Sequence, residues 1–216
     1  MKLNNKYIDL ITSDNSKYKL SVKNTDKKTQ KIILEYLENN INKWNHNENF
    51  TNYIEQTNKS FTFNATNVQS LKNISKRKNI NALTIKAVMF TALDLIHTLE
   101  KYRFSIIDFE LDDFIFIEMG GEIESKDYTI FCLFIGFDKL MKVKNDFIEI
   151  IVPLQKNKFF APEIEKISSL PAKLSYPNKS GYYSIGKIAV FLLSKNTKTR
   201  TMDKYKTDLA PLLNTK

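Results

Sequence analysis

Apolar and polar positions follow two different periods along this chain. Short segments with strand-type content lie at 7–12 and 17–23, and two predicted hairpins lie at 50–65 and 114–137. Longer segments with apolar residues three and four positions apart lie at 25–44, 81–102 and 182–193. The pattern predicts an α+β fold with three main helices, and a proline-punctuated stretch at 153–179 reads as irregular.

The composition changes near residue 81. Asparagine occurs 17 times up to Asn81 and 5 times after it, whereas all five glycines lie at position 120 or later. No internal repeat is visible. We therefore expect two regions of different character, 1–80 and 81–216.

The balance of charge and the single cysteine limit the classes of function. The 216 residues carry a formal charge of +9, mostly from lysine, which favours loose association with anionic partners. The densest basic segment, 72–81, is typical of a solvated loop before a helix, and nucleic-acid binding is not indicated beyond this charge. Cys132 is the only cysteine, which excludes a disulfide framework and a zinc site built on thiols.

The sequence gives no sign of a membrane or secretory protein. No uninterrupted apolar run reaches the roughly 18 residues of a membrane span. The first ten residues, "MKLNNKYIDL", lack the charge, apolar run and cleavage site of a signal peptide. We expect an intracellular protein, cytoplasmic or nuclear, with no membrane partner.

The segment "IIDFELDDFIFIE" (106–118) carries four acids among aromatic and β-branched residues. Its spacing resembles the catalytic loop H-R-D-L-x-x-x-N of protein kinases, with Asp108 at the catalytic Asp and Asp113 at the Asn. The resemblance implies that Asp108 is a candidate base and Asp113 a candidate metal ligand. Ile106 and Ile107 replace the His and Arg, and we expect both to pack into the core. Glu110 stands where a phosphate-facing lysine is usual.

Two further segments follow in the order that this resemblance requires. The A-P-E at 161–163 matches the end of the kinase activation segment. The segment "GYYSIGK" matches the D-x-W-S-x-G helix at Ser184 and Gly186, but Gly181 replaces its Asp. The chain thus resembles a bilobal protein kinase, with a β-rich N-lobe at 1–80 and a C-lobe at 81–216 that is truncated after the helix near 182–193. Because the family's partner for the A-P-E glutamate lies in the missing part, Glu163 should be unpaired or paired differently.

The nucleotide-binding residues of the family are represented only in part. The D-F-G motif reads G-F-D at 136–138, so Asp138 is displaced from the usual position of the metal ligand. Lys23 in "LSVK" resembles the lysine of V-A-I-K, and Glu35 or Glu38 on the next helix could be its ion-pair partner. No glycine precedes Gly120, so the Gly-rich loop cannot form, and the turn 12–17, with Asp14, is expected in its place.

These losses predict a catalytically impaired kinase-like protein, a pseudokinase, that acts by binding or regulating a protein partner. ATP and Mg²⁺ would bind weakly or not at all and are not required. One alternative is an atypical active Ser/Thr-type kinase with Asp108 as base and Asp113 and Asp138 as metal ligands. Another is an α+β interaction domain unrelated to kinases. The Lys- and Asn-rich, shortened chain is similar to kinase-like proteins of large DNA viruses.

Overall fold

The structure, a computed structural model, confirms the α+β class and divides the chain into two compact units. Unit 1 comprises Met1–Leu71 and Asp112–Asp138, and unit 2 comprises Lys72–Leu111 and Lys139–Lys216. The residues that the structure describes are 2–12, 16–45, 53–77, 80–119, 129–150, 154–167, 172–175 and 178–195.

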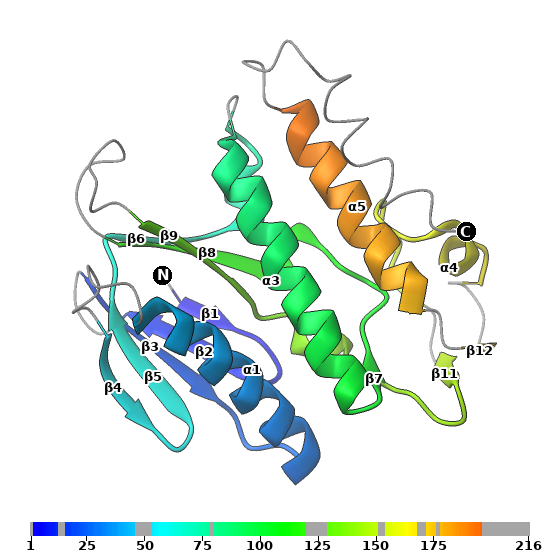
Figure 1. Cartoon of the computed structure of the whole chain (residues 1–216), viewed down its shortest axis with the longest axis horizontal. Coiled ribbons are helices and arrows are strands. Elements are labelled where there is room, and N and C mark those ends of the chain that lie inside the picture. The colour runs from blue at the N-terminus through cyan, green and yellow to red at the C-terminus, as the bar shows by residue number, and fades with distance from the viewer. Residues whose placement is uncertain are drawn as a thin grey trace. The chain divides into compact units, whose positions relative to one another are not determined.

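Unit 1 contains a five-stranded antiparallel sheet in the order β1-β2-β3-β5-β4 (Figure 1). The strands are β1 (Lys2–Asn4), β2 (Ile8–Thr12), β3 (Lys17–Val22), β4 (Tyr53–Thr57) and β5 (Ser60–Asn64). Leu20 pairs with Leu10 on one side and with Phe61 on the other, and all three side chains are buried. The strands predicted at 7–12 and 17–23 and the first hairpin are confirmed, whereas β1 was missed.

Helix α1 (Lys27–Asn45) packs against this sheet because its apolar residues share one face (Figure 1). The residues that predicted the helix are all buried: Ile32, Ile33, Tyr36, Leu37 and Ile41. Asp26 accepts a hydrogen bond from the backbone N–H of Thr29 and so caps the first turn. The helix predicted at 25–44 is confirmed.

A second sheet of unit 1 has the order β6-β8-β9. Its strands are β6 (Asn67–Ser70), β8 (Phe114–Met119) and β9 (Thr129–Phe134). The first four residues of β8 are buried on both faces of the sheet, which explains the uninterrupted apolar run that follows the acidic string. The second predicted hairpin is confirmed; Met119 of its "MGGE" segment ends β8, and residues 120–122 lie outside the described residues.

Unit 2 is built around α3 (Ala82–Lys101) and α5 (Asn178–Ser194), which pack side by side (Figure 1). Asn81 caps α3 by accepting a hydrogen bond from the N–H of Leu83. The shorter elements are α2 (Leu71–Ile74), α4 (Pro162–Ile167), β7 (Phe104–Ser105) paired with β10 (Met141–Lys142), and β11 (Phe147–Ile150) paired with β12 (Ala172–Ser175). Of these, α2 begins at the last residue of unit 1.

Two expectations for the second half of the chain need correction. The stretch 153–179 is not irregular throughout, because it contains α4 and β12. Helix α5 begins at Asn178, four residues before the predicted start at 182. Tertiary packing accounts for α4, because its Ile164 belongs to a buried cluster with Ile107 and Phe160.

Helix α3 is the one helix, among the residues that the structure describes, that is long and apolar enough to cross a membrane by length and composition. Eight of its residues are buried within the protein. Core helices of soluble proteins have the same length and composition, so this feature gives no evidence about a membrane.

Candidate functional site

The acidic string contains a buried apolar anchor, as predicted. Ile106 and Ile107 are 2% and 0% exposed, so their packing in the core is confirmed. Their backbone lies against α5, where the Ser184 hydroxyl donates a hydrogen bond to the Ile107 carbonyl at 3.3 Å. A Cβ atom at Gly181 would lie 2.9 Å from the Ile106 carbonyl oxygen. Gly181 therefore leaves room for the loop backbone itself.

Asp108, the candidate base, lies in unit 2 and is only 7% exposed. The side-chain amide of Asn157 donates hydrogen bonds to the Asp108 carboxylate and, at 2.8 Å, to the Phe109 carbonyl. The Asn157 side-chain oxygen accepts a bond from the N–H of Phe159 at 2.9 Å. A buried carboxylate needs such donors. One of the Asp108 oxygens is therefore engaged inside the protein.

Glu110, expected to make the site more acidic, is paired with a lysine of the same unit. Its carboxylate lies 3.1 Å from the Lys139 ammonium. The Lys139 side chain is 17% exposed, so the pair is less screened by water than a pair on the surface. The negative charge that Glu110 adds is thus offset locally.

Glu163 of the A-P-E segment is bound by a serine of α5. The Ser180 hydroxyl, fully buried near the start of α5, donates a hydrogen bond of 2.5 Å to the Glu163 carboxylate. The Lys187 ammonium of the same helix donates to the Phe160 carbonyl at 3.1 Å. Helix α5 therefore holds both the loop at 106–109 and the segment that leads into α4.

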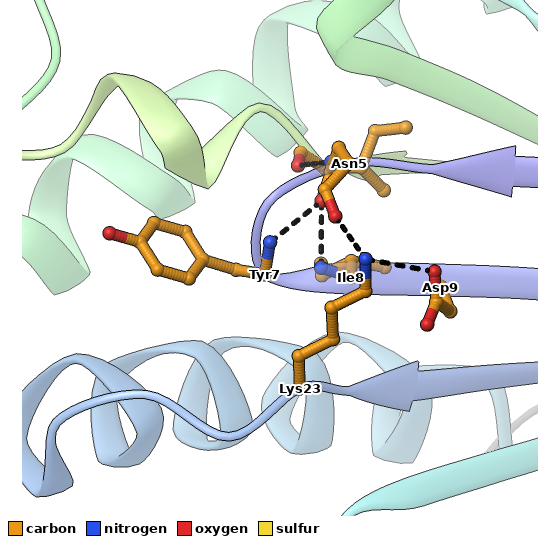
Figure 2. Close-up of polar contacts among 6 residues, drawn as sticks. Asn5, Tyr7, Ile8, Asp9 and Lys23 are labelled. Atoms are coloured by element: carbon orange, nitrogen blue, oxygen red, sulfur yellow. Dashed lines mark hydrogen bonds and ion pairs between the residues drawn. The ribbon is translucent and has the colours of Figure 1, made fainter.

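Lys23, the candidate phosphate-binding lysine, lies in unit 1 just after β3. Figure 2 shows its ammonium between the Asn5 carbonyl, at 2.5 Å, and the Asp9 carboxylate, at 3.1 Å. Both side chains of the ion pair are about two-thirds buried, at 29% and 31% exposure. The lysine therefore contacts the turn between β1 and β2, which its position in the sequence does not indicate.

Asn5 fixes this turn through its own side chain (Figure 2). Its side-chain oxygen accepts hydrogen bonds from the N–H groups of Tyr7, at 3.1 Å, and Ile8, at 2.7 Å. Its side-chain amide donates to the Ile135 carbonyl at 2.6 Å. Asn5 thus connects the β1–β2 turn to the end of β9, 130 residues along the chain.

Asp113, a candidate metal ligand, packs directly against Gly136. The Asp113 carbonyl accepts a hydrogen bond from the Ile135 N–H at 2.7 Å. A Cβ atom built on Gly136 would lie 2.4 Å from an Asp113 carboxylate oxygen and 2.8 Å from its Cβ. Real Cβ atoms essentially never approach another atom so closely, so a side chain at position 136 would require the Asp113 side chain to move. Asp113 is 6% exposed.

The other predicted site residues have partners of their own or stay untested. Asp138 is exposed, and its carboxylate raises the pKa of Lys6, after the larger effect of a hydrogen bond to Tyr7. Glu38 accepts a hydrogen bond from Gln56 on β4 at 3.0 Å. The ion pair between Lys23 and Glu35 remains a prediction. The turn 12–17 lies partly outside the described residues, which exclude Asp14.

The structure thus groups part of the predicted site within unit 1. A chain of contacts runs from Asp113 through Ile135 and Asn5 to Lys23 and Asp9, and we call it the Asn5 network. Asp108 belongs to unit 2. Sequence reasoning missed Asn5 and Asn157, because an asparagine in a loop gives no signal of which distant backbone it binds. Within the described part of the chain, no three His, Cys, Asp or Glu side chains form a group that could hold a metal ion.

Comparisons with known proteins add no relative. No protein-family model matches the chain, and no curated protein matches it.

Proposed function

We propose that the chain is a degenerate, bilobal protein kinase-like protein that binds or regulates a protein partner and does not transfer phosphate. The order of elements supports this reading. A protein kinase carries its nucleotide lysine on the third strand, before the helix that supplies the ion-pair glutamate. Lys23 follows β3 directly, and α1 comes next.

Packing around the G-F-D segment supports the same proposal. In the family the Phe of D-F-G packs in a way that sets the active or inactive state. Phe137 is fully buried, and its ring meets the rings of Tyr36 on α1 and Phe134 on β9 edge-on, at 5.5 and 5.3 Å between centroids. The phenylalanine is thus retained where the metal ligand beside it is lost.

The observation that carries the loss of activity is the contact between Gly136 and Asp113. Phosphoryl transfer depends on metal ions that bridge the phosphates and neutralise developing charge. Position 136 carries no side chain, and a carboxylate there would require the observed Asp113 side chain to move. The hydrogen bonds of Asn157 to the Asp108 loop act in the same direction, because they occupy the candidate base.

A surface is available for partner binding. Leu83 and Phe90 of α3 are the most exposed large apolar side chains among the described residues, at 63% and 67%. They lie seven positions apart and so share one face of the helix. Exposed apolar side chains of this size favour association with another protein.

Melting in the presence of nucleotide tests the proposal. A ligand at a hundred times its dissociation constant stabilises a protein by about 2.7 kcal/mol, roughly 5–10 °C in melting temperature for a chain of this size. We expect millimolar Mg-ATP to shift the melting temperature by less than about 1 °C. A shift of several degrees that is abolished in Lys23→Ala and in Asp113→Ala would instead support the active kinase. Transfer of labelled phosphate that disappears in Asp108→Asn would overturn the proposal.

A further inference from the structure

Several hydrogen bonds hold the turn between β1 and β2 in unit 1. The Asn5 N–H donates to the Ile8 carbonyl at 3.0 Å, and the Lys23 N–H donates to the Tyr7 carbonyl at 2.8 Å. The side chain of Asn5 adds its bonds to Tyr7, Ile8 and Ile135. Hydrogen bonds therefore connect the turn within itself, to Lys23 just after β3, and to Ile135 just after β9.

We propose that this turn blocks anion binding at Lys23, because the protein's own groups occupy the Lys23 ammonium. We call this arrangement the closure. The Asn5 carbonyl and the Asp9 carboxylate take the place that phosphate oxygens would have on the ammonium. The inference rests on the proposed function, because Lys23 is a nucleotide residue only through the kinase resemblance. It adds a reason for weak nucleotide binding. The lysine is present, but its ammonium already binds the Asn5 carbonyl and the Asp9 carboxylate.

The chemistry of the ammonium explains why this closure is stable. A lysine ammonium has three donors and no acceptor, and here two of those donors meet a carbonyl and a carboxylate. Hydrogen bonds with an ionised partner are about twice as strong as neutral ones. Partial burial of Lys23 and Asp9 reduces screening by water, so an incoming anion must displace a partly desolvated carboxylate.

The second anchor of the closure lies at the end of β9. The bond from the Asn5 amide to the Ile135 carbonyl sits one residue before Gly136, against which Asp113 packs. Opening the turn would break the hydrogen bond between the Asn5 amide and the Ile135 carbonyl, which lies in a partly buried region. Asn5 therefore couples the closure of the lysine to the position at which the family's metal ligand is lost.

Amine acylation followed by mass spectrometry tests the closure in the full chain. The reagent must reach the amine nitrogen, so a lysine whose nitrogen is engaged by a carboxylate and a carbonyl reacts slowly. We expect Lys23 to react about tenfold more slowly than Lys19, which is exposed on the neighbouring β3. Asp9→Asn, a near-isosteric change, should remove most of that difference. Asn5→Ala should accelerate hydrogen exchange at the Tyr7 and Ile8 amides about fivefold.

Asp146→Asn is the matched control, because it removes an exposed ion pair with Arg103 in unit 2 and should leave the Lys23 rate unchanged. Circular-dichroism melts establish that each variant is folded. A wild-type Lys23 that reacts as fast as Lys19, or a rate that Asp9→Asn leaves unchanged, would overturn the closure. The proposed function fails by a different result, a large Mg-ATP shift in the wild-type protein, so the two failures are distinguishable.

Discussion

Two glycines show how the absence of a side chain allows close contacts at single residues. Gly136 leaves room for Asp113 within unit 1, and Gly181 leaves room for the Ile106 carbonyl within unit 2. In each case the missing Cβ atom is what allows the approach. An aspartate at either position would require its neighbour to move.

Gly136→Ala should destabilise the protein by about 1–3 kcal/mol, because the new Cβ meets Asp113 in a packed site. Urea unfolding measures the change. In an Asp113→Gly background the same substitution should cost less, since the side chain that it meets is gone. Equal costs in the two backgrounds would contradict the contact.

Ile107→Ala should destabilise unit 2 by about 2–4 kcal/mol, because Ile107 is fully buried in the cluster with Phe160 and Ile164. The shift of the denaturant midpoint measures the loss. Leu83→Ala is the control, since Leu83 is 63% exposed and should change stability by no more than about 0.5 kcal/mol. An unchanged midpoint for Ile107→Ala would disprove the apolar anchor.

Helix α5 is the element that organises the polar contacts of unit 2. Ser180, Ser184 and Lys187 bind Glu163, Ile107 and Phe160 in turn, so one helix holds two separate loops. The segment before α4 adds an aromatic contact, with the rings of Phe159 and Phe191 5.7 Å apart. Asn157 completes the connection by binding the Asp108 loop.

Asn157→Ala should therefore loosen the segment before α4 and the Asp108 loop together. It removes donors from a buried carboxylate and a carbonyl, and it removes the acceptor of the Phe159 N–H. We expect a loss of about 1–3 kcal/mol and faster hydrogen exchange at Phe159. Asn24→Ala, whose side chain is exposed and accepts a bond from Lys59, should have little effect. Protection of Phe159 that survives in Asn157→Ala would refute the connection.

The whole molecule carries a net positive charge, and several of its described acids form ion pairs. The formal charge is +9, yet Asp9, Glu110 and Asp146 each form an ion pair with a lysine or arginine. Acids paired in this way are poor ligands for a hard cation, because binding would have to break the pair.

Removal or addition of divalent metal should leave the stability of the molecule unchanged. Melting temperatures in EDTA and in millimolar Mg²⁺ should agree within about 1 °C, because a metal bound at a hundred times its dissociation constant would add about 2.7 kcal/mol. Asp113→Asn serves as the matched variant. A magnesium-dependent rise that is lost in Asp113→Asn would point to a metal site at that residue and favour the active-kinase alternative.

The sequence by itself determined the helices α1, α3 and α5, the two hairpins and the burial of Ile106 and Ile107. These features follow from local periodicity, because an apolar face at helical or alternating spacing has to be buried wherever the chain goes. The approximate bounds of the main elements were predictable for the same reason. The kinase resemblance also comes from the sequence and remains a proposal.

Only the tertiary structure decided the partners of the candidate site residues. Lys23 contacts Asn5 and Asp9, and Asp108 is bound by Asn157, 49 residues along the chain. The pairing of β6 with β8 places residues 112–138 in unit 1. A hydrogen bond between distant residues depends on where the folded chain brings two groups, and neither residue type nor spacing contains that information. The same holds for α4, which exists because Ile164 completes a buried cluster.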